Sequence, residues 1–156
     1  MRIAIAADHN GIALKAQVVA RLTELGHQVD DRGAFDAEQI VDYPVLCADL
    51  CASVLDGSAE RGIVVGGSGS GEHMACNKIR GIRAGLGIEP FTARISRAHN
   101  DANVLIIGAK VIEPGPAVAI VEQWLVTEFK GGRHQQRLDQ IAALERGESI
   151  PTGSTR

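Results

Sequence analysis

The sequence has few aromatic residues and no long apolar run. One Trp, one Tyr and three Phe occur among 156 residues, and the formal net charge is −3 at pH 7. Nothing in this composition indicates broad binding to nucleic acid or to a membrane. No apolar run reaches the roughly 18 residues that a membrane-spanning helix requires, and no signal-peptide pattern follows Met1. We therefore expect a cytoplasmic protein.

Cysteine is also scarce, with three residues in the chain. Cys47 and Cys51 are four residues apart on a predicted helix, and Cys76 lies in the helix after a glycine-rich loop. Because no second His or Cys pair matches them, they form a weak metal-binding pattern. We expect three reduced, small core residues. A chain of this length buries about two-thirds of its unfolded surface, so it needs neither metal nor disulfide to fold, and we expect no cofactor.

Short apolar strands alternate with helices, which predicts a parallel sheet covered on both faces. The expected fold class is α/β: a three-layer αβα sandwich with a Rossmann-like, five-stranded parallel sheet, in a single domain over residues 1–146. Residues 147–156 lack periodicity, and we expect a mobile tail. The predicted strands are residues 2–7, 27–31, 62–65, 82–88 and 104–108, and the predicted helices are residues 12–25, 43–55, 90–98, 114–129 and 133–146, with one more from the glycine-rich loop to about 79.

The glycine-rich loop follows the third predicted strand, in the segment G-G-S-G-S-G-E-H-M that starts at Gly66. Glycine lets the backbone turn sharply and approach a ligand closely. Backbone N–H groups in such a loop and in the next helical turn favour negative charge, so we predict an anion-binding cradle. Ligands of such sheets bind beyond the carboxyl ends of the strands, where Asp8–His9 and Ala109–Lys110 also fall. The position of His99–Asn100, before the fifth strand, stays open.

Three better-known glycine-rich motifs do not fit this loop. A P-loop requires Lys and then Ser or Thr after Gly71, where the chain has Glu72–His73. A dinucleotide-binding fingerprint that starts at Gly67 requires a small residue at position 72. A nucleophile elbow around Ser68 requires Gly at position 70, where the chain has Ser.

Glu72 is a carboxylate beside the predicted cradle. Backbone donors that stabilise a developing oxyanion, next to a base that removes a proton, suit proton abstraction α to a carbonyl group. The alternative is that Glu72 only caps its helix and interacts with the helix dipole, as acidic first-turn residues commonly do. The residue pattern alone leaves both interpretations open.

Three further groups carry candidate chemistry, and each has a structural alternative. Asp8–His9 suits proton transfer or phosphate contact, or else forms a turn and a helix cap. His99 offers a titratable group among small polar residues, which are also ordinary loop residues. Arg133 and Arg137 lie four apart on a predicted helix, with His134 beside them. They suit a phosphate monoester or form a solvated basic face.

Four segments together resemble type B ribose-5-phosphate isomerase, in a sugar-phosphate isomerase family that also includes galactose-6-phosphate and allose-6-phosphate isomerases. The resemblance covers the chain to about residue 146, with the segments in the same order and spacing. It implies an enzyme of the pentose phosphate pathway that interconverts ribose 5-phosphate and ribulose 5-phosphate through a cis-enediolate, without a metal. The segments are A-A-D-H-N-G from Ala6, G-G-S-G-S-G-E-H-M-A-C-N-K from Gly66, R-A-H-N-D-A-N-V-L-I-I-G-A-K from Arg97 and G-G-R-H-Q-Q-R from Gly131.

The resemblance also implies roles for the candidate residues. Glu72 matches the base that transfers a proton between C1 and C2, His99 the group that assists ring opening, and Asp8 a contact to the ring oxygen or a neighbouring hydroxyl. The resemblance implies a homodimer whose active sites lie between the subunits. Whether two dimers pair further into a tetramer stays open. The implied enediolate-binding set is Gly67, Ser68, Gly69, Ser70 and Gly71, the implied sugar contacts are Tyr43 and Asn100, and the implied phosphate contacts are His9, Lys110, Arg133, His134 and Arg137.

Two positions depart from the commoner family pattern. Many members carry a cysteine base just before the glycine-serine run, at the position of Gly66. A second branch carries a glutamate base after the loop, and Glu72 matches that branch. Lys110 stands where arginine is common, so it keeps the charge but lacks the bidentate fork.

Two alternatives remain. One is an isomerase of another aldose phosphate, such as allose 6-phosphate, galactose 6-phosphate or a tetrose phosphate. The other is a non-catalytic phosphate-sensing module of the receiver type. A receiver places an acceptor aspartate after the third strand, where this chain has Gly66, so the sequence disfavours it.

Overall fold

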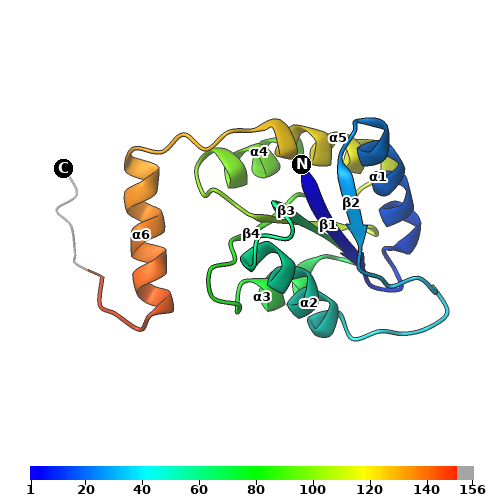
Figure 1. Cartoon of the computed structure of the whole chain (residues 1–156), viewed down its shortest axis with the longest axis horizontal. Helices are drawn as coiled ribbons and strands as arrows, with labels where there is room; N and C mark the ends of the chain where they lie inside the picture. The colour runs from blue at the N-terminus through cyan, green and yellow to red at the C-terminus, as the bar shows by residue number, and fades with distance from the viewer. Residues whose placement is uncertain (151–156) are drawn as a thin grey trace.

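A five-stranded parallel sheet forms the centre of the protein in the computed structural model, which describes residues 1–150 (Figure 1). The strand order is β2-β1-β3-β5-β4, and each neighbouring pair is parallel. This arrangement confirms the predicted α/β class. The strands are β1 (Arg2–Ala7), β2 (Gln28–Asp31), β3 (Arg61–Gly66), β4 (Ala84–Leu86) and β5 (Val104–Gly108).

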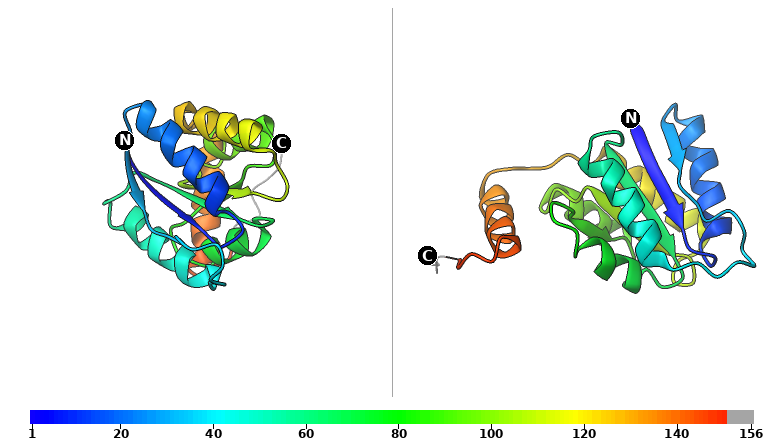
Figure 2. Two further views of the ribbon diagram at one scale, coloured as in Figure 1. Left: turned by 90° about the vertical axis from the view of Figure 1, so that its right-hand side faces the viewer. Right: turned by 60° about the horizontal axis from the view of Figure 1, so that its bottom comes forward.

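Helices cover both faces of the sheet. Helices α1 (Ile12–Glu24), α4 (Pro90–Ala98) and α5 (Pro114–Val126) lie over one face, and α2 (Tyr43–Leu55) and α3 (Ser70–Cys76) over the other (Figure 1). The last helix, α6 (Arg133–Glu145), stands away from the sheet at the end of an extended connection (Figure 2). The three predicted layers are therefore present, and α6 lies outside them.

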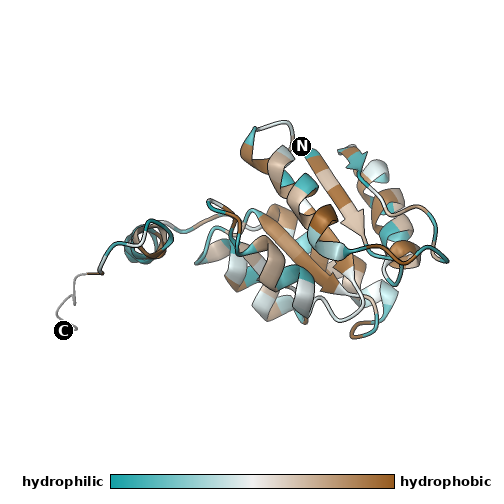
Figure 3. Cartoon of the chain, turned by 90° about the horizontal axis from the view of Figure 1, so that it is seen from below, coloured by the Kyte–Doolittle hydropathy of each residue, from teal (hydrophilic) through white to brown (hydrophobic). Residues whose placement is uncertain are grey.

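The core consists of two apolar clusters, one on each side of the sheet. Alternation along β1 explains this division: Ile3 and Ile5 pack toward α1 and α5, whereas Ala4 and Ala6 pack toward α2. Strands β3 and β5 are apolar along most of their length (Figure 3), whereas the edge strand β2, with the sequence Q-V-D-D, is mostly polar, unlike the uniformly apolar strands expected from the sequence. The cysteines are free and buried in the second cluster, as predicted: Cys47, Cys51 and Cys76.

The largest differences from the predicted bounds are in three elements, and the other bounds that differ do so by one residue. Helix α3 ends at Cys76 and β4 covers only Ala84–Leu86. Between them, the side chain of Asn77 binds the N–H and the C=O of Ala84 at 3.0 and 3.1 Å, which ties the end of α3 to the start of β4. Helix α5 ends at Val126, since Thr127 turns to an extended backbone with ψ of 125°.

Part of the predicted tail, residues 151–156, lies outside the described residues. Within residues 1–150, no helix has the length and apolar character needed to cross a membrane. The same range contains no group of three or more His, Cys, Asp or Glu side chains that could hold a metal ion.

Candidate active site

The loops after β1, β3 and β5 meet at the carboxyl edge of the sheet. The N–H of Asp8 donates to the carbonyl of Val65 at 3.1 Å, and the N–H groups of Ala109 and Lys110 donate to Gly66 and Gly67 at 2.8 and 2.9 Å. These bonds bring the three predicted strand ends together. The resulting carboxyl-edge cluster comprises Asp8, His9, Asn10, Tyr43, Gly66–Glu72 and Lys110.

The glycine-rich loop is tightly packed against its neighbours. Gly69 has a φ of 80°, in the left-handed region that glycine adopts without a steric penalty. A Cβ on Gly108 would overlap the Ser68 carbonyl, and one on Gly71 would overlap the Tyr43 ring. The Ser68 hydroxyl accepts a hydrogen bond from the N–H of Ser70 at 3.2 Å. The loop therefore has a defined shape, with Tyr43 against its far end.

Glu72 lies in the first turn of α3 and is buried, with 4% of its surface exposed. Its carboxylate folds back against Gly66, where a Cβ would overlap the carboxyl carbon and both oxygens. The helix N-cap is Gly69, which makes no side-chain cap bond, and Glu72 is the acidic residue of the first turn, where it also interacts favourably with the helix dipole. The space that a side chain at position 66 would fill is therefore occupied by the Glu72 carboxylate.

The environment of Glu72 favours its neutral form. Burial is the main reason that the pKa of Glu72 is raised, and the negative charge of Asp8 raises it further, although a hydrogen bond from its own backbone N–H opposes the shift. A carboxylate with a raised pKa is a stronger base once ionised, and it sits beside the backbone donors of the loop.

Asn10 links Asp8 and His9. One oxygen of Asp8 accepts bonds from the N–H groups of Asn10 and Gly11 at 2.9 and 3.1 Å, and the other accepts from Asn10 Nδ2 at 2.9 Å. Asn10 Nδ2 also lies 3.1 Å from His9 Nε2. Because an amide nitrogen only donates, Nε2 must accept, and the proton of neutral His9 lies on Nδ1. That atom is buried without a hydrogen-bond partner.

A second group of polar side chains surrounds His99 and α6. The His99 and His134 rings stack with centroids 4.0 Å apart and an interplanar angle of 14°. The N–H of Lys130 donates to the Ala98 carbonyl at 3.0 Å, which ties the connection before α6 to the end of α4. This amino-edge cluster comprises His99, Asn100, Lys130, Arg133, His134 and Arg137.

Both histidines in the amino-edge cluster are held toward the neutral form. Desolvation lowers the pKa of His99, and the positive charges around it, first that of Lys130, lower it further. The pKa of His134 is lowered by desolvation and by His99 and the two arginines of α6. A neutral imidazole can accept one proton and donate another, which suits acid–base chemistry near pH 7.

The two clusters lie at opposite edges of the sheet. Helix α4 runs antiparallel to the strands and ends at His99, just before the amino end of β5, whereas Gly66 and Gly108 pair at the carboxyl end. A five-residue strand spans about 16 Å. A single chain therefore does not assemble all the predicted site residues. The predicted phosphate set is divided, with His9 and Lys110 at the carboxyl edge and Arg133, His134 and Arg137 near the amino edge.

Sequence reasoning missed three contributors. Asn10 lies in the D-H-N-G turn. An Asp at the start of such a turn commonly accepts a hydrogen bond from the backbone N–H two residues later, and this Asx-turn pattern could have indicated the contact. Lys130 adjoins His99 only because the chain returns from α5 past the end of α4. Asp101 binds two arginines. Its spacing of four residues from Arg97 is a local signal for one ion pair, whereas no local pattern indicates the contact with Arg83.

The fold and the carboxyl-edge cluster define an α/β protein with a buried carboxylate beside a glycine-rich loop, an arrangement that suits a proton-transfer enzyme. Residues 3–141 match the model of the Ribose/Galactose Isomerase family. The chain belongs to this family.

Similar proteins agree with that assignment. Ribose-5-phosphate isomerase B of Escherichia coli is 42% identical over 144 residues, which are 92% of this chain and 96% of that protein. A Clostridium thermocellum ribose-5-phosphate isomerase B structure has a TM-score of 0.92 at 41% identity, covering 96% of this chain and 100% of that one. A Mycoplasma genitalium ribose-5-phosphate isomerase B structure with bound ribulose-5-phosphate has a TM-score of 0.89 at 34% identity, over 93% of this chain and 96% of that one.

Proposed function

We propose that the protein interconverts ribose 5-phosphate and ribulose 5-phosphate, with Glu72 as the base. The observation that carries this proposal is the buried Glu72 carboxylate, which lies against Gly66 at the mouth of the glycine-rich loop. The membership of the Ribose/Galactose Isomerase family supports the reaction class, and the ligand of the similar Mycoplasma genitalium structure supports a five-carbon substrate.

The proposed reaction begins with opening of the furanose ring, in which His99 moves the proton between the ring oxygen and the C1 hydroxyl. Glu72 then removes the C2 proton of the aldehyde, and the electron pair forms the C1–C2 double bond of a cis-enediolate. The loop N–H groups stabilise its developing oxygen charge. A proton moves from the C2 hydroxyl to O1, and return of the first proton from Glu72 to C1, with the carbonyl now at C2, gives the ketose. The proton balance closes without a redox cofactor.

We also propose that each active site combines the carboxyl-edge cluster of one chain with the amino-edge cluster of a second copy. The separation of the clusters within one chain supports this arrangement, since ring opening and proton abstraction must act on the same sugar. Helix α6 supports it too, because its apolar residues Ile141 and Leu144 are exposed at 41% and 59%. A second copy could cover this apolar surface. A two-fold homodimer would form two such sites.

The experiment that tests the proposed function is an assay of chelator-treated protein with ribose 5-phosphate, with allose 6-phosphate and galactose 6-phosphate in parallel. We expect fast turnover of the pentose phosphate. Preferred turnover of a hexose phosphate would move the protein to the alternative substrate within the family. Absence of turnover on all three sugars would refute the proposed isomerase activity under these conditions.

Replacement of Arg137 by Ala is expected to raise KM for ribose 5-phosphate about tenfold or more while changing kcat little. A guanidinium that binds the phosphate far from the reacting carbons contributes mainly uniform binding. Steady-state kinetics measure both constants. Arg146→Ala is the matched control, since Arg146 caps the other end of α6 and pairs with Glu148. An unchanged KM in the Arg137 variant would contradict the phosphate contact.

The pH profile is expected to reflect the raised pKa of Glu72. Because the base must be ionised, activity should be lost as the pH decreases. The midpoint of this loss should lie above the ordinary glutamate pKa of 4.5. Asp8→Asn removes a negative neighbour, so it should move that acidic limb to lower pH. The comparison uses the same substrate, so the phosphate ionisation is common to both profiles. An identical limb in both proteins would show that Asp8 does not act on Glu72.

A further inference from the structure

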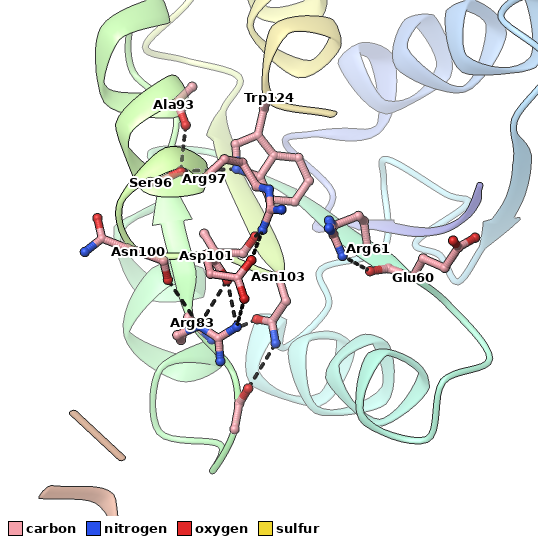
Figure 4. Close-up of polar contacts among 12 residues, drawn as sticks. Glu60, Arg61, Arg83, Ala93, Ser96, Arg97, Asn100, Asp101, Asn103 and Trp124 are labelled. Atoms are coloured by element: carbon pink, nitrogen blue, oxygen red, sulfur yellow. Dashed lines mark hydrogen bonds and ion pairs between the residues drawn. The ribbon is translucent and has the colours of Figure 1, made fainter. Parts of the chain in front are cut away.

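We propose that Asp101 is a positioning residue that fixes His99 and Asn100 for the ring-opening step. The proposal rests on the proposed function, because it concerns the step assigned there to His99. It is carried by a hydrogen-bonded clasp that comprises Arg83, Arg97 and Asp101 (Figure 4).

Asp101 holds an unusual backbone conformation directly after the two candidate site residues. Its φ is 45°, and it is the one non-glycine residue with positive φ within residues 1–150. Such a conformation costs free energy for a residue with a Cβ, although Asp and Asn tolerate it better than most. Surrounding contacts must therefore maintain it.

Each carboxylate oxygen of Asp101 accepts from a different arginine. Oδ1 accepts from Arg97 Nη1 at 2.7 Å, and Oδ2 accepts from Arg83 Nη2 at 2.8 Å. The same guanidinium groups also hold the loop backbone. Arg83 donates to the carbonyls of Asn100 at 3.1 Å and Asp101 at 2.8 and 3.0 Å, and Arg97 donates to that of Ala102 at 2.8 Å. Three successive carbonyl groups are thus fixed.

The two arginines are themselves anchored on different elements. Arg97 lies on α4, is 4% exposed and has its guanidinium 5.8 Å from the centroid of the Trp124 ring. Arg83 precedes β4, and its N–H donates to the Asn103 side chain at 2.8 Å. The clasp therefore joins the loop to both α4 and the edge strand of the sheet.

The clasp leaves the candidate site residues available. The His99 ring stacks on His134, and the Asn100 side chain is exposed and points away from the arginines (Figure 4). The Asp101 carboxylate is already bound by both arginines, so it is not free for substrate. This division distinguishes a positioning residue from a catalytic one.

The variant Asp101→Asn tests the proposal. Asn tolerates positive φ and has nearly the same shape, but it lacks the charge that both arginines bind. We expect kcat for conversion of ribose 5-phosphate to fall about tenfold or more, because small displacements of a reacting group have effects of this size or larger. KM should change less than kcat, since the clasp makes no contact with the phosphate-binding candidates Arg133 and Arg137 of α6.

A second readout separates ring opening from proton transfer. Ribulose 5-phosphate cannot close a furanose ring, because its C5 oxygen carries the phosphate group. Enzyme-catalysed exchange of its C1 hydrogen with deuterium from the solvent therefore requires Glu72 but no ring opening. We expect the exchange rate of Asp101→Asn to stay within about twofold of the wild-type rate, because the clasp does not act on the proton transfer by Glu72.

Two further variants make the test decisive. Arg83→Lys keeps the charge but loses the fork, so it should show the same selective loss even if Asp101→Asn proves too unstable to purify. Asp49→Asn is the matched control, because it breaks the ion pair with Arg32, 2.8 Å long, outside the site, and it should retain wild-type turnover. Parallel loss of turnover and exchange, or loss of neither, would overturn the positioning role. Absence of both activities in the wild-type protein would instead reject the proposed function.

Discussion

Replacement of Glu72 by Gln is expected to lower kcat by about 10³-fold, within the range that a general base contributes. Gln preserves the shape of the side chain against Gly66 but cannot take a proton from the sugar. Substrate should still bind, because the phosphate contacts are unchanged. Ribose 5-phosphate turnover and substrate binding by calorimetry measure the two effects separately.

The same variant should be at least as stable as the wild type at pH 7. Since folding raises the pKa of Glu72, the folded state disfavours the ionised form, and stability from this group decreases as the pH rises toward and through the folded pKa. A neutral Gln removes that cost. Glu128→Gln, at an exposed position, is the control for this stability comparison.

Residual turnover of Glu72→Gln above a tenth of the wild-type rate would show that another residue is the base.

Replacement of Gly66 by Ala is the second change with a large expected effect. The added methyl group would occupy the space of the Glu72 carboxylate, so the base must move away from the position from which it reaches the sugar. Displacements of about 1 Å can cost roughly 10²-fold in rate, and we expect a loss of that size in kcat. Steady-state kinetics and the deuterium exchange reaction should lose activity together, because proton transfer itself is affected.

The control for this variant is Gly115→Ala. A Cβ at Gly115, in α5, meets no atom within 4 Å, so an extra methyl group there should leave turnover unchanged. Wild-type turnover in Gly66→Ala would mean that Glu72 need not occupy the observed position.

Local sequence patterns were sufficient for most of the fold. Apolar runs and Pro at helix starts predicted β1, α2, α4 and β5 with their observed bounds. The largest difference in a strand was in β4, which was predicted as seven residues and has three. The start of β4 is held by the side chain of Asn77, just after α3, and such a contact leaves no periodic signal in the strand.

The site was only partly predictable for a related reason. Residues that follow strands meet at one edge, so Asp8, Glu72 and Lys110 could be grouped from their order in the chain. His99 follows a helix, and helices in this fold run antiparallel to the strands, so its position at the opposite edge needed the topology. The contact between Arg83 and Asp101 depends on tertiary packing alone.

The proposed active site combines Glu72 of one chain with His99 of a second copy. Its most direct test is to co-express differently tagged Glu72→Gln and His99→Ala chains and purify the heterodimer. In the proposed arrangement one of the two sites has both wild-type residues, so we expect about half the wild-type activity from two inactive parents.

The reciprocal heterodimer completes the measurement. A wild-type chain paired with a chain that carries both substitutions should have almost no activity, because each shared site then lacks one of the two residues. The opposite pattern, with activity in this heterodimer and none in the first, would show that Glu72 and His99 act within one chain and would contradict the shared site.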